Sequence, residues 1–264
     1  RQGTTAIRGQ LASPVQGNFK TRIFELAKLA GSVDIENPAM PMKQLKLPVS
    51  GHVQADLGKS AFAGALSTRF DETSLQSSWK VLRLAPLSAS LDLVIDRLNV
   101  DRYFPPAQST TAGSAVSAKD TPVDLSFLKI ADVKGSLRIG FLQARNVKIS
   151  NLKAPLQLAK GRLDVSPMSA QAYQGTIAGS VMANAQGNRI AVKQAMSNIN
   201  IGPLLKDAAN KDIIEGRGTV NVDVNTGGAT VNAMKQALGG TASLQLRDGA
   251  IKGINLAASL RDFK

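Results

Sequence analysis

Residues that could carry out acid–base or nucleophilic chemistry are scarce in this sequence. His52 is the only histidine and cysteine is absent, so a Ser-His-Asp triad would have to be built on His52 and no thiolate is available. His52 follows Gly51 at a turn into an expected strand, and its sequence neighbourhood supplies no positioned partner. We therefore expect no catalytic residue at this position.

The carboxylates do not suggest a catalytic pair either. Asp92, Asp96, Asp223 and Asp248 fall at turns or on the polar side of expected strands. A glycosidase needs two carboxylates that flank a sugar cleft, and aromatic residues, which line such clefts, make up only 4% of this chain. The sequence therefore gives no local indication of glycoside hydrolysis.

Two short motifs resemble ligand sites but lack required residues. Gly58-Lys59-Ser60 matches the end of a phosphate-binding loop, yet Val53 stands where that motif requires glycine. Asn221, Asp223 and Asn225 resemble part of a calcium loop, but they alternate along an expected strand and the loop's glycine and terminal glutamate are missing. We predict a protein that is not an enzyme and that has no cofactor and no bound metal.

The chain is strongly basic, with a net charge of +13 and a pI near 10.2. Such a surface favours polyanions, which include nucleic acid, anionic lipid headgroups and lipopolysaccharide. The basic residues are spread singly along expected strands, as at Arg138, Arg145, Lys148 and Lys153. Because a nucleic-acid site requires a clustered patch or stacking aromatics, we predict no nucleic-acid partner and interpret these residues as a solvated face.

The sequence divides at a stretch of small polar residues, 107–122, which has the composition of a flexible linker or loop. It separates a β-rich N-terminal part, 1–106, from a C-terminal β domain, 123–264. No apolar run reaches the length of about 20 residues that spans a bilayer, and no signal peptide is present. We therefore interpret the chain as a soluble fragment of a longer protein.

The C-terminal part is a series of short alternating segments joined by turns such as Gln186-Gly187-Asn188, which predicts an antiparallel meander with one apolar and one polar face. The residues expected on the apolar face are Leu137, Ile139, Val147, Ile149, Leu156, Leu158, Leu163, Val165, Val220, Val222, Val224, Leu244 and Leu246.

A few short helices and turns complete the expected elements. Gly202-Pro203 begins one helix, Thr230 caps a second that ends at Gly239, and 256–263 forms a third. Segment 20–30 is compatible with a helix or a strand. Arg247-Asp248-Gly249 carries a tight hairpin signal that should end the preceding strand.

The apolar face has two possible uses. A sheet normally buries its apolar face against a second layer, which would make these residues an ordinary closed core. The expected helices are too short and too few to cover a long sheet, so the sheet either folds on itself or presents an apolar groove. A groove of this kind would accommodate acyl chains.

Residues from about 134 to 260 resemble the C-terminal portion of the AsmA family. The resemblance rests on an ordered series of segments, which includes Tyr173-Gln174-Gly175, the helix start at Gly202-Pro203-Leu204-Leu205, and the block from Gly240 to Leu256. The N-terminal part is only compatible with the family.

The resemblance implies a mainly β protein whose elongated, curled antiparallel sheets form a half-pipe with an apolar interior, without catalytic residues. It implies a periplasmic domain of a parent protein held in the inner membrane of a Gram-negative bacterium, which handles phospholipid or another envelope lipid during outer-membrane biogenesis. Envelope proteins are further possible partners. The alternative is a structural or interaction module that assists outer-membrane protein assembly, with the apolar face as a closed core.

Overall fold

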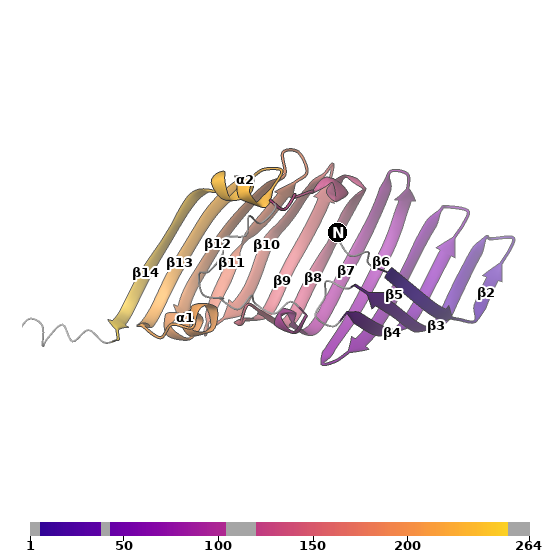
Figure 1. Cartoon of the computed structure of the whole chain (residues 1–264). Helices are drawn as coiled ribbons and strands as arrows, with labels where there is room; N and C mark the ends of the chain where they lie inside the picture. The colour runs from indigo at the N-terminus through magenta and orange to yellow at the C-terminus, as the bar shows by residue number, and fades with distance from the viewer. Residues whose placement is uncertain (1–5, 38–42, 104–119, 253–264) are drawn as a thin grey trace, which may run out of the picture.

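The computed structural model describes residues 6–37, 43–103 and 120–252. They form one 14-stranded sheet in which successive strands are neighbours, except that β1 and β2 both pair with β3 (Figure 1). The expectation of a mainly β, curled and largely antiparallel fold is confirmed. The first half of the sheet contains β1 (Ala6–Ala12), β2 (Val15–Asn18), β3 (Ile23–Glu36), β4 (Gln44–Asp56), β5 (Ala61–Phe70), β6 (Thr73–Leu84) and β7 (Leu87–Asn99).

The second half continues the same sheet from β7 without a break. Its strands are β8 (Ala131–Ala144), β9 (Val147–Ala159), β10 (Arg162–Ala172), β11 (Gly175–Asn184), β12 (Arg189–Asn200), β13 (Ile214–Gly227) and β14 (Gly239–Ile251). Most of the expected linker, 107–122, lies outside the described residues.

The junction of the two halves differs from every other pairing in the described sheet, because β7 and β8 run parallel. The chain must therefore return from one end of the strands to the other between Asn99 and Ala131. The short 3₁₀ helix η1 (Val100–Arg102) lies at the first end, where Asp101 accepts a hydrogen bond of 2.8 Å from the Asn146 amide in the β8–β9 turn. At the other end, the Val231 amide donates to the Thr121 carbonyl at 2.9 Å.

These two ends of the strands form the rims of the sheet. We call upper rim the end that carries the turns at 19–22, 57–60, 85–86 and 160–161 together with helix α2 (Val231–Gln236). It lies at the top of Figure 1. The lower rim carries the turns at 71–72, 145–146 and 173–174 together with helix α1 (Ile201–Ala209).

Local sequence accounts for the start of α2 and the end of α1, but α2 ends at Gln236 and not at the expected Gly239, which begins β14. Thr230 caps α2 by accepting a hydrogen bond of 3.2 Å from the Ala233 amide, as expected for threonine at this position. Helix α1 begins at Ile201, and it ends at Asn210, whose φ of 52° is left-handed and whose amide donates to the Lys206 carbonyl. The third expected helix, 256–263, lies outside the described residues.

Two local expectations are resolved by the strand pairing. Segment 20–30, left open between helix and strand, mostly belongs to strand β3. The expected hairpin at Arg247-Asp248-Gly249 is wrong, because β14 continues through it to Ile251. Asp248 has a φ of 52° and lies beside Gly216, whose φ is 120°. The two residues form an irregularity in the β13–β14 ladder, where the register shifts between Glu215 and Arg217.

The sheet is open and exposes far more surface than a compact protein. The accessible surface of the chain is 18031 Å², whereas a compact monomer of 27.7 kDa exposes about 11,000 Å². The described core is correspondingly small. Its main cluster consists of Ala170, Ala172, Ile177, Ile199 and Ile201, near the lower rim.

Candidate functional site

One face of the sheet is apolar across its whole length. Residues that pair from strand to strand form continuous rows, and one row contains only apolar residues and glycine from β2 to β14. Its members are Val15, Leu26, Val53, Gly64, Trp79, Leu91, Gly135, Leu156, Val165, Val181, Val192, Val224 and Gly240. We call this face, between the two rims, the trough.

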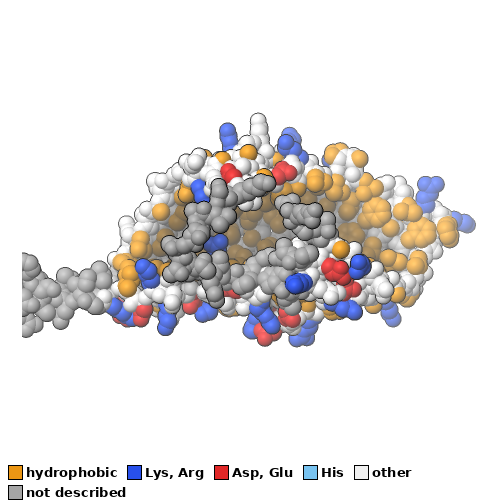
Figure 2. Space-filling model, in the orientation of Figure 1, with side chains coloured by type: hydrophobic (Ala, Val, Ile, Leu, Met, Phe, Trp, Pro, Cys, Tyr) orange, Lys and Arg blue, Asp and Glu red, His pale blue; other side chains and the backbone are white. Residues whose placement is uncertain are grey.

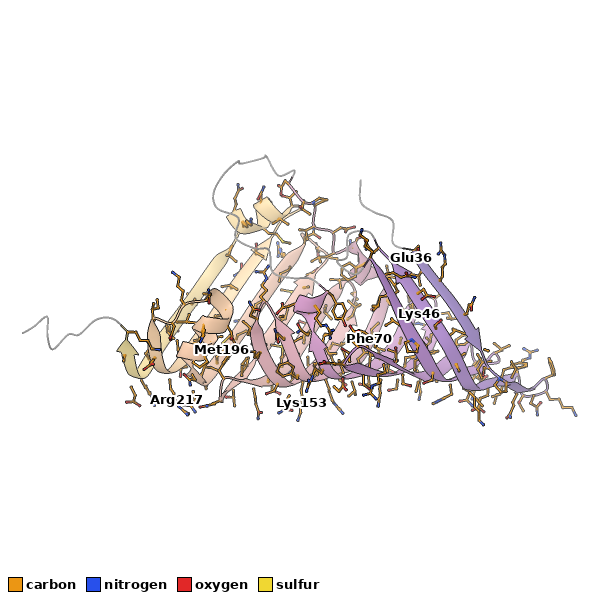
Figure 3. All side chains as sticks on the ribbon, turned by 60° about the horizontal axis from the view of Figure 1, so that its bottom comes forward. Glu36, Lys46, Phe70, Lys153, Met196 and Arg217 are labelled. Atoms are coloured by element: carbon orange, nitrogen blue, oxygen red, sulfur yellow. The ribbon has the colours of Figure 1, made fainter. Side chains whose placement is uncertain are left out.

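The opposite face has a different composition. One of its rows mixes polar, charged and small apolar residues. Its members from β5 to β13 are Ser67, Gln76, Val94, Arg138, Lys153, Ser169, Ala178, Ala195 and Asn221. Figure 2 shows hydrophobic side chains gathered in the hollowed face of the molecule and charged side chains around it. In Figure 3, Lys153 and Arg217 lie on the outer side, while Phe70 and Met196 lie on the inner side.

All thirteen residues expected on one apolar face share the trough. The pairing shows this directly for Leu137 and Ile139 on β8, and for Leu156, Val165 and Val224 across β9, β10 and β13. The remaining eight lie on the same face: Val147, Ile149, Leu158, Leu163, Val220, Val222, Leu244 and Leu246.

A bulge in β9 is needed to keep both halves of this strand facing the trough. Ile149 and Leu152 are three positions apart, so strict alternation would place them on opposite faces. Both nevertheless pack against the core cluster, because Asn151 between them has a left-handed φ of 53°.

The thirteen residues differ in exposure, which separates structural from accessible positions. Ile139 is only 4% exposed, and Ile149 packs against the cluster beneath α1. Both therefore contribute to the core. Leu244 and Leu246, on the last strand, are 50% and 40% exposed. Val222 is half-buried, as are most trough residues between the rims.

Sequence reasoning recognised the alternation of Leu91, Leu93 and Ile95 on β7 but missed the trough surface of the strands before it. Trp79, Leu66 and Val53 face the same side as the expected residues and extend the apolar surface through β4, β5 and β6. The alternation of β4 could have revealed it, since odd-numbered residues from Leu45 to Ala55 are half-buried and most even-numbered ones are exposed. The prolines at 38, 41 and 48 obscured this pattern by suggesting irregular connections.

Helix α1 covers the lower end of the trough and is held there by a polar contact. Leu204 and Leu205 pack against the core cluster. Asp207 accepts hydrogen bonds from the Tyr173 hydroxyl at 2.9 Å and from Lys148 Nζ at 3.0 Å. The Lys148 ammonium lowers the pKa of the Asp207 carboxyl, and burial together with the Asp207 contact raises the pKa of Tyr173 to about 12.

A single long polar side chain lies on the floor of the trough. Gln194 on β12 pairs with Gly179 and Val222, and its Oε1 atom is buried without a hydrogen-bond partner. A Cβ atom at Gly179 would lie 2.8 Å from this oxygen, so the glycine makes room for the amide. Thr68, on the same face in the N-terminal half, also has a buried and unpartnered hydroxyl.

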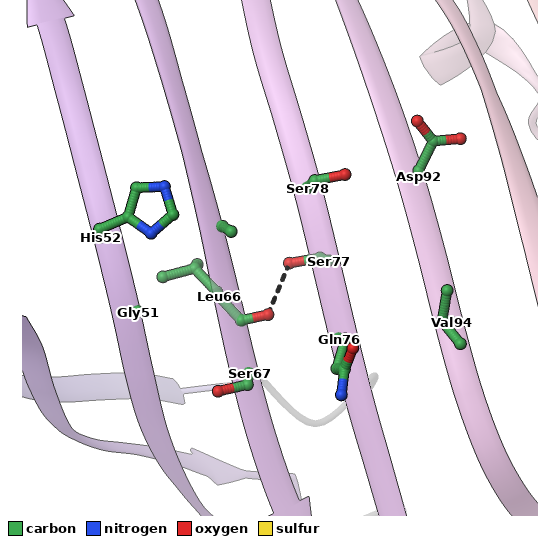
Figure 4. A pocket seen from close by; sticks show the side chains of 10 residues that line it. Gly51, His52, Leu66, Ser67, Gln76, Ser77, Ser78, Asp92 and Val94 are labelled. Carbon is green, nitrogen blue, oxygen red and sulfur yellow. Dashed lines mark hydrogen bonds between the residues drawn. The ribbon is translucent and has the colours of Figure 1, made fainter.

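His52 lies on the polar face, away from the trough. It lines a shallow pocket of about 430 Å³ together with Ser67, Ser78 and Asp92 (Figure 4). The Ser77 hydroxyl nearby donates to the Leu66 carbonyl at 3.3 Å, and Asp92 accepts from the Ser136 hydroxyl. The pocket therefore brings together no nucleophile, base and orienting acid in hydrogen-bond contact.

The other motifs singled out in the sequence have structural roles in the described chain. Gly58-Lys59-Ser60 forms the β4–β5 turn, where the Lys59 amide donates to Asp56 at 3.0 Å. Asp223 lies on the polar face of β13 and pairs with Lys193 at 2.9 Å. Within the described residues, no group of three or more histidine or carboxylate side chains could hold a metal ion.

The described helices are short, and none is long and apolar enough to cross a membrane. No match to a curated protein or to a solved structure reaches significance. The model of the AsmA family matches residues 94–263, which covers the second half of the sheet and the end of β7. This chain therefore belongs to the AsmA family, whose members are associated with the cell envelope and its biogenesis.

Proposed function

We propose that this chain is a non-enzymatic lipid-handling domain in which the trough shields acyl chains of phospholipid or another envelope lipid. The domain works in the periplasm of a Gram-negative bacterium and contributes to lipid transport during outer-membrane biogenesis. Its parent protein is anchored in the inner membrane by a segment outside this chain.

One observation carries the proposal, which is the unbroken apolar row from Val15 to Gly240. The strands on the path from β1 to β14, at about 4.8 Å each, extend the sheet over about 55 Å. An uncharged surface of this length extends well beyond the apolar patches of a few hundred Å² that ordinary monomers expose. An acyl chain that lies along this row meets an apolar side chain or a glycine at every strand.

The energetics favour a sliding mode of binding. Each methylene that leaves water contributes about 0.8 kcal/mol to binding. Burial of part of an acyl chain therefore contributes more binding free energy than the weak, exposed contacts of the lipid headgroup. The row has the same chemistry at each strand, so moving a chain by one strand exchanges equivalent contacts. Transport along the trough then requires no covalent step.

Site-specific photocrosslinking tests this proposal. A benzophenone amino acid at Val222 should crosslink to co-purified or added phospholipid, and the same probe at Asn221, on the polar face of β13, should not. A second pair, Leu91 and Asp92 on β7, tests the N-terminal half. Equal labelling at trough and polar positions, or no labelling at either, would contradict lipid binding in the trough.

A second candidate function has support from the last strand of the described sheet. One edge of β14 has no partner strand among the described residues, and its side chains Leu244 and Leu246 are substantially exposed. An open edge of 13 residues can accept a strand from another protein by β-augmentation. A module that assists outer-membrane protein assembly would bind its partner there, and a proline within β14 would abolish that binding without changing lipid crosslinking at Leu91.

A further inference from the structure

The two rims of the sheet differ in where exposed hydrophobic side chains lie. On the upper rim, large apolar side chains lie in turns, at the end of β6, and in and directly after the 3₁₀ helix η2 (Ser126–Lys129). They are Phe19, Leu57, Leu82, Leu84, Phe127 and Ile130, with exposures from 51% to 86%. Leu238, after α2, is 60% exposed at the same rim.

The lower rim has few such residues in the described part of the chain. Ile7 is 69% exposed and Ile213 is 49% exposed, and they lie at opposite ends of that rim. Exposed apolar residues scattered singly are normal on a protein surface, so the lower rim needs no special explanation. The upper rim differs because a series of them follows one line across the sheet.

The upper rim also carries basic side chains without ion-pair partners among the described residues. Upper-rim carboxylates are used in local turns and caps, as where Asp120 accepts from the Asn232 amide at 3.0 Å and Asp132 from the Lys160 amide at 3.0 Å. Most of the basic side chains on this rim form no ion pair with a described residue. They are Lys20, Arg22, Arg83, Lys129, Lys160, Arg189 and Lys235.

On the lower rim, several basic side chains are already paired with carboxylates. Arg8 contacts Glu36 at 3.0 Å, Lys148 contacts Asp207 at 3.0 Å, and Lys252 contacts Asp212 at 2.7 Å. Other basic side chains of the lower rim, such as Lys43, Arg145 and Lys206, form no ion pair with a described residue. Unpaired cations therefore occur on both rims, and the upper rim differs in the exposed apolar side chains that lie between them.

We propose that the upper rim is a membrane-docking surface, which inserts its apolar turns into the headgroup region of a bilayer and places its lysines and arginines against anionic phosphates. Aliphatic and aromatic tips flanked by basic residues are the combination that favours the interface of an anionic membrane. The strands would then stand on the membrane with the trough opening beside the headgroups. This proposal does not depend on whether the trough holds lipid.

A lipid surface explains the arrangement better than a protein partner does. The apolar side chains are spaced along separate turns and strand ends from the β2–β3 connection to α2, so they form a line about 50 Å long instead of a compact patch. Protein interfaces concentrate their binding energy in a packed, desolvated centre. A bilayer imposes no such centre, since each inserted side chain meets the same environment.

Flotation with vesicles tests the proposal. The whole chain should float with vesicles of phosphatidylglycerol and phosphatidylethanolamine, and much less with phosphatidylcholine alone. Replacing Leu57, Leu84 and Ile130 together by serine should lower the partition coefficient by about tenfold per residue. The matched control, Ile7→Ser with Ile213→Ser on the lower rim, should change it less than twofold.

A charge series and a depth measurement complete the experiment. Arg22→Gln, Arg83→Gln and Lys235→Gln should each weaken binding to anionic vesicles by about fivefold. The single tryptophan allows a clean depth probe, since Leu84→Trp in a Trp79→Phe background should be quenched by brominated lipid, whereas Ile7→Trp should not.

Three results would overturn the proposal. The first is the absence of flotation with anionic vesicles. The second is an equal loss of binding in the upper-rim and lower-rim serine variants. The third is a loss of binding to a purified protein partner in the upper-rim variant while its vesicle binding is intact, which would make the rim a protein-docking surface. Val222→Asp should leave flotation intact, so a failure of the trough is distinguishable from a failure of the rim.

Discussion

The substitution Val222→Asp separates an open trough from a closed core. Val222 lies on β13 with its half-buried side chain in the trough, between Gln194 on β12 and Ala242 on β14. Asn221, the adjacent residue, lies on the polar face, so Asn221→Asp adds the same charge on the other side of the same strand. The two variants place the same carboxylate on opposite faces of one strand, so a difference between them shows which face the lipid contacts.

The expected effect on lipid binding follows from the strand spacing. One strand occupies about 4.8 Å along the trough, which corresponds to about four methylenes of an extended acyl chain. A carboxylate at Val222 keeps those methylenes from leaving water and costs about 3 kcal/mol of binding at about 0.8 kcal/mol each. This loss corresponds to a weakening of binding by more than a hundredfold.

The expected effect on folding is much smaller in an open trough. The carboxylate at position 222 remains hydrated there, so Val222→Asp should reduce the free energy of unfolding by about 1 to 2 kcal/mol, within the ordinary range for a half-buried site. In a closed core, an unpaired charge would cost several kcal/mol and unfold the domain. Urea unfolding and displacement of a fluorescent fatty acid measure the two quantities on the same sample.

Two outcomes would refute this reasoning. If Val222→Asp unfolds the protein while Asn221→Asp does not, the face is closed. If Val222→Asp remains folded and binds the fatty acid as tightly as the unchanged protein, the acyl chain does not lie in this part of the trough.

Three further predictions concern stability. Ile199→Ala should lower the free energy of unfolding by about 2 to 5 kcal/mol in urea denaturation, because Ile199 is 1% exposed at the centre of the core cluster. Gly135→Ala should destabilise the β7–β8 junction, since a Cβ atom there would collide with the Leu91 carbonyl oxygen, whereas Gly239→Ala, with no atom within 4 Å, should be nearly neutral in thermal unfolding. Asp207→Asn should lower the free energy of unfolding by about 1 to 3 kcal/mol at pH 7. Because the pKa of Asp207 is lowered in the folded state, its contribution to stability is present above about pH 4 and is lost as pH falls through the folded-state pKa. In urea unfolding at pH 3, the stability difference between this variant and the unchanged chain should therefore shrink.

Alternation in the sequence was sufficient to assign the trough residues of the C-terminal half. Val220, Val222 and Val224 share a face because the side-chain period of a strand is two. Alternation also predicts a polar partner face, which Asn221 and Asp223 occupy. The shortage of helices left two shapes open, a sheet folded on itself and an apolar groove, and only the resemblance to the AsmA family implied a half-pipe. The structure has an open sheet that α1 and α2 are too short to cover.

The remaining features depend on interactions between distant segments. The parallel pairing of β7 with β8 has no local signal, because the linker composition at 107–122 fits either a domain boundary or a return crossing. The hairpin expected at Asp248-Gly249 does not form. The strand continues instead, and the extra residue is accommodated opposite Gly216 as an irregularity in the β13–β14 ladder. The line of exposed side chains on the upper rim becomes visible only when register places separate turns side by side.

The parallel junction between β7 and β8 has a consequence for how this sheet folds. Outside this junction, most pairs of neighbouring strands are joined by a short connection, so their contacts are close in sequence and form quickly. At the β7–β8 junction, paired residues such as Leu91 and Gly135 are more than forty positions apart, and their loop must close before any contact compensates for the lost entropy. The two meanders can thus gain and lose structure as separate cooperative units, and hydrogen exchange should resolve them as two groups of amides with different opening free energies.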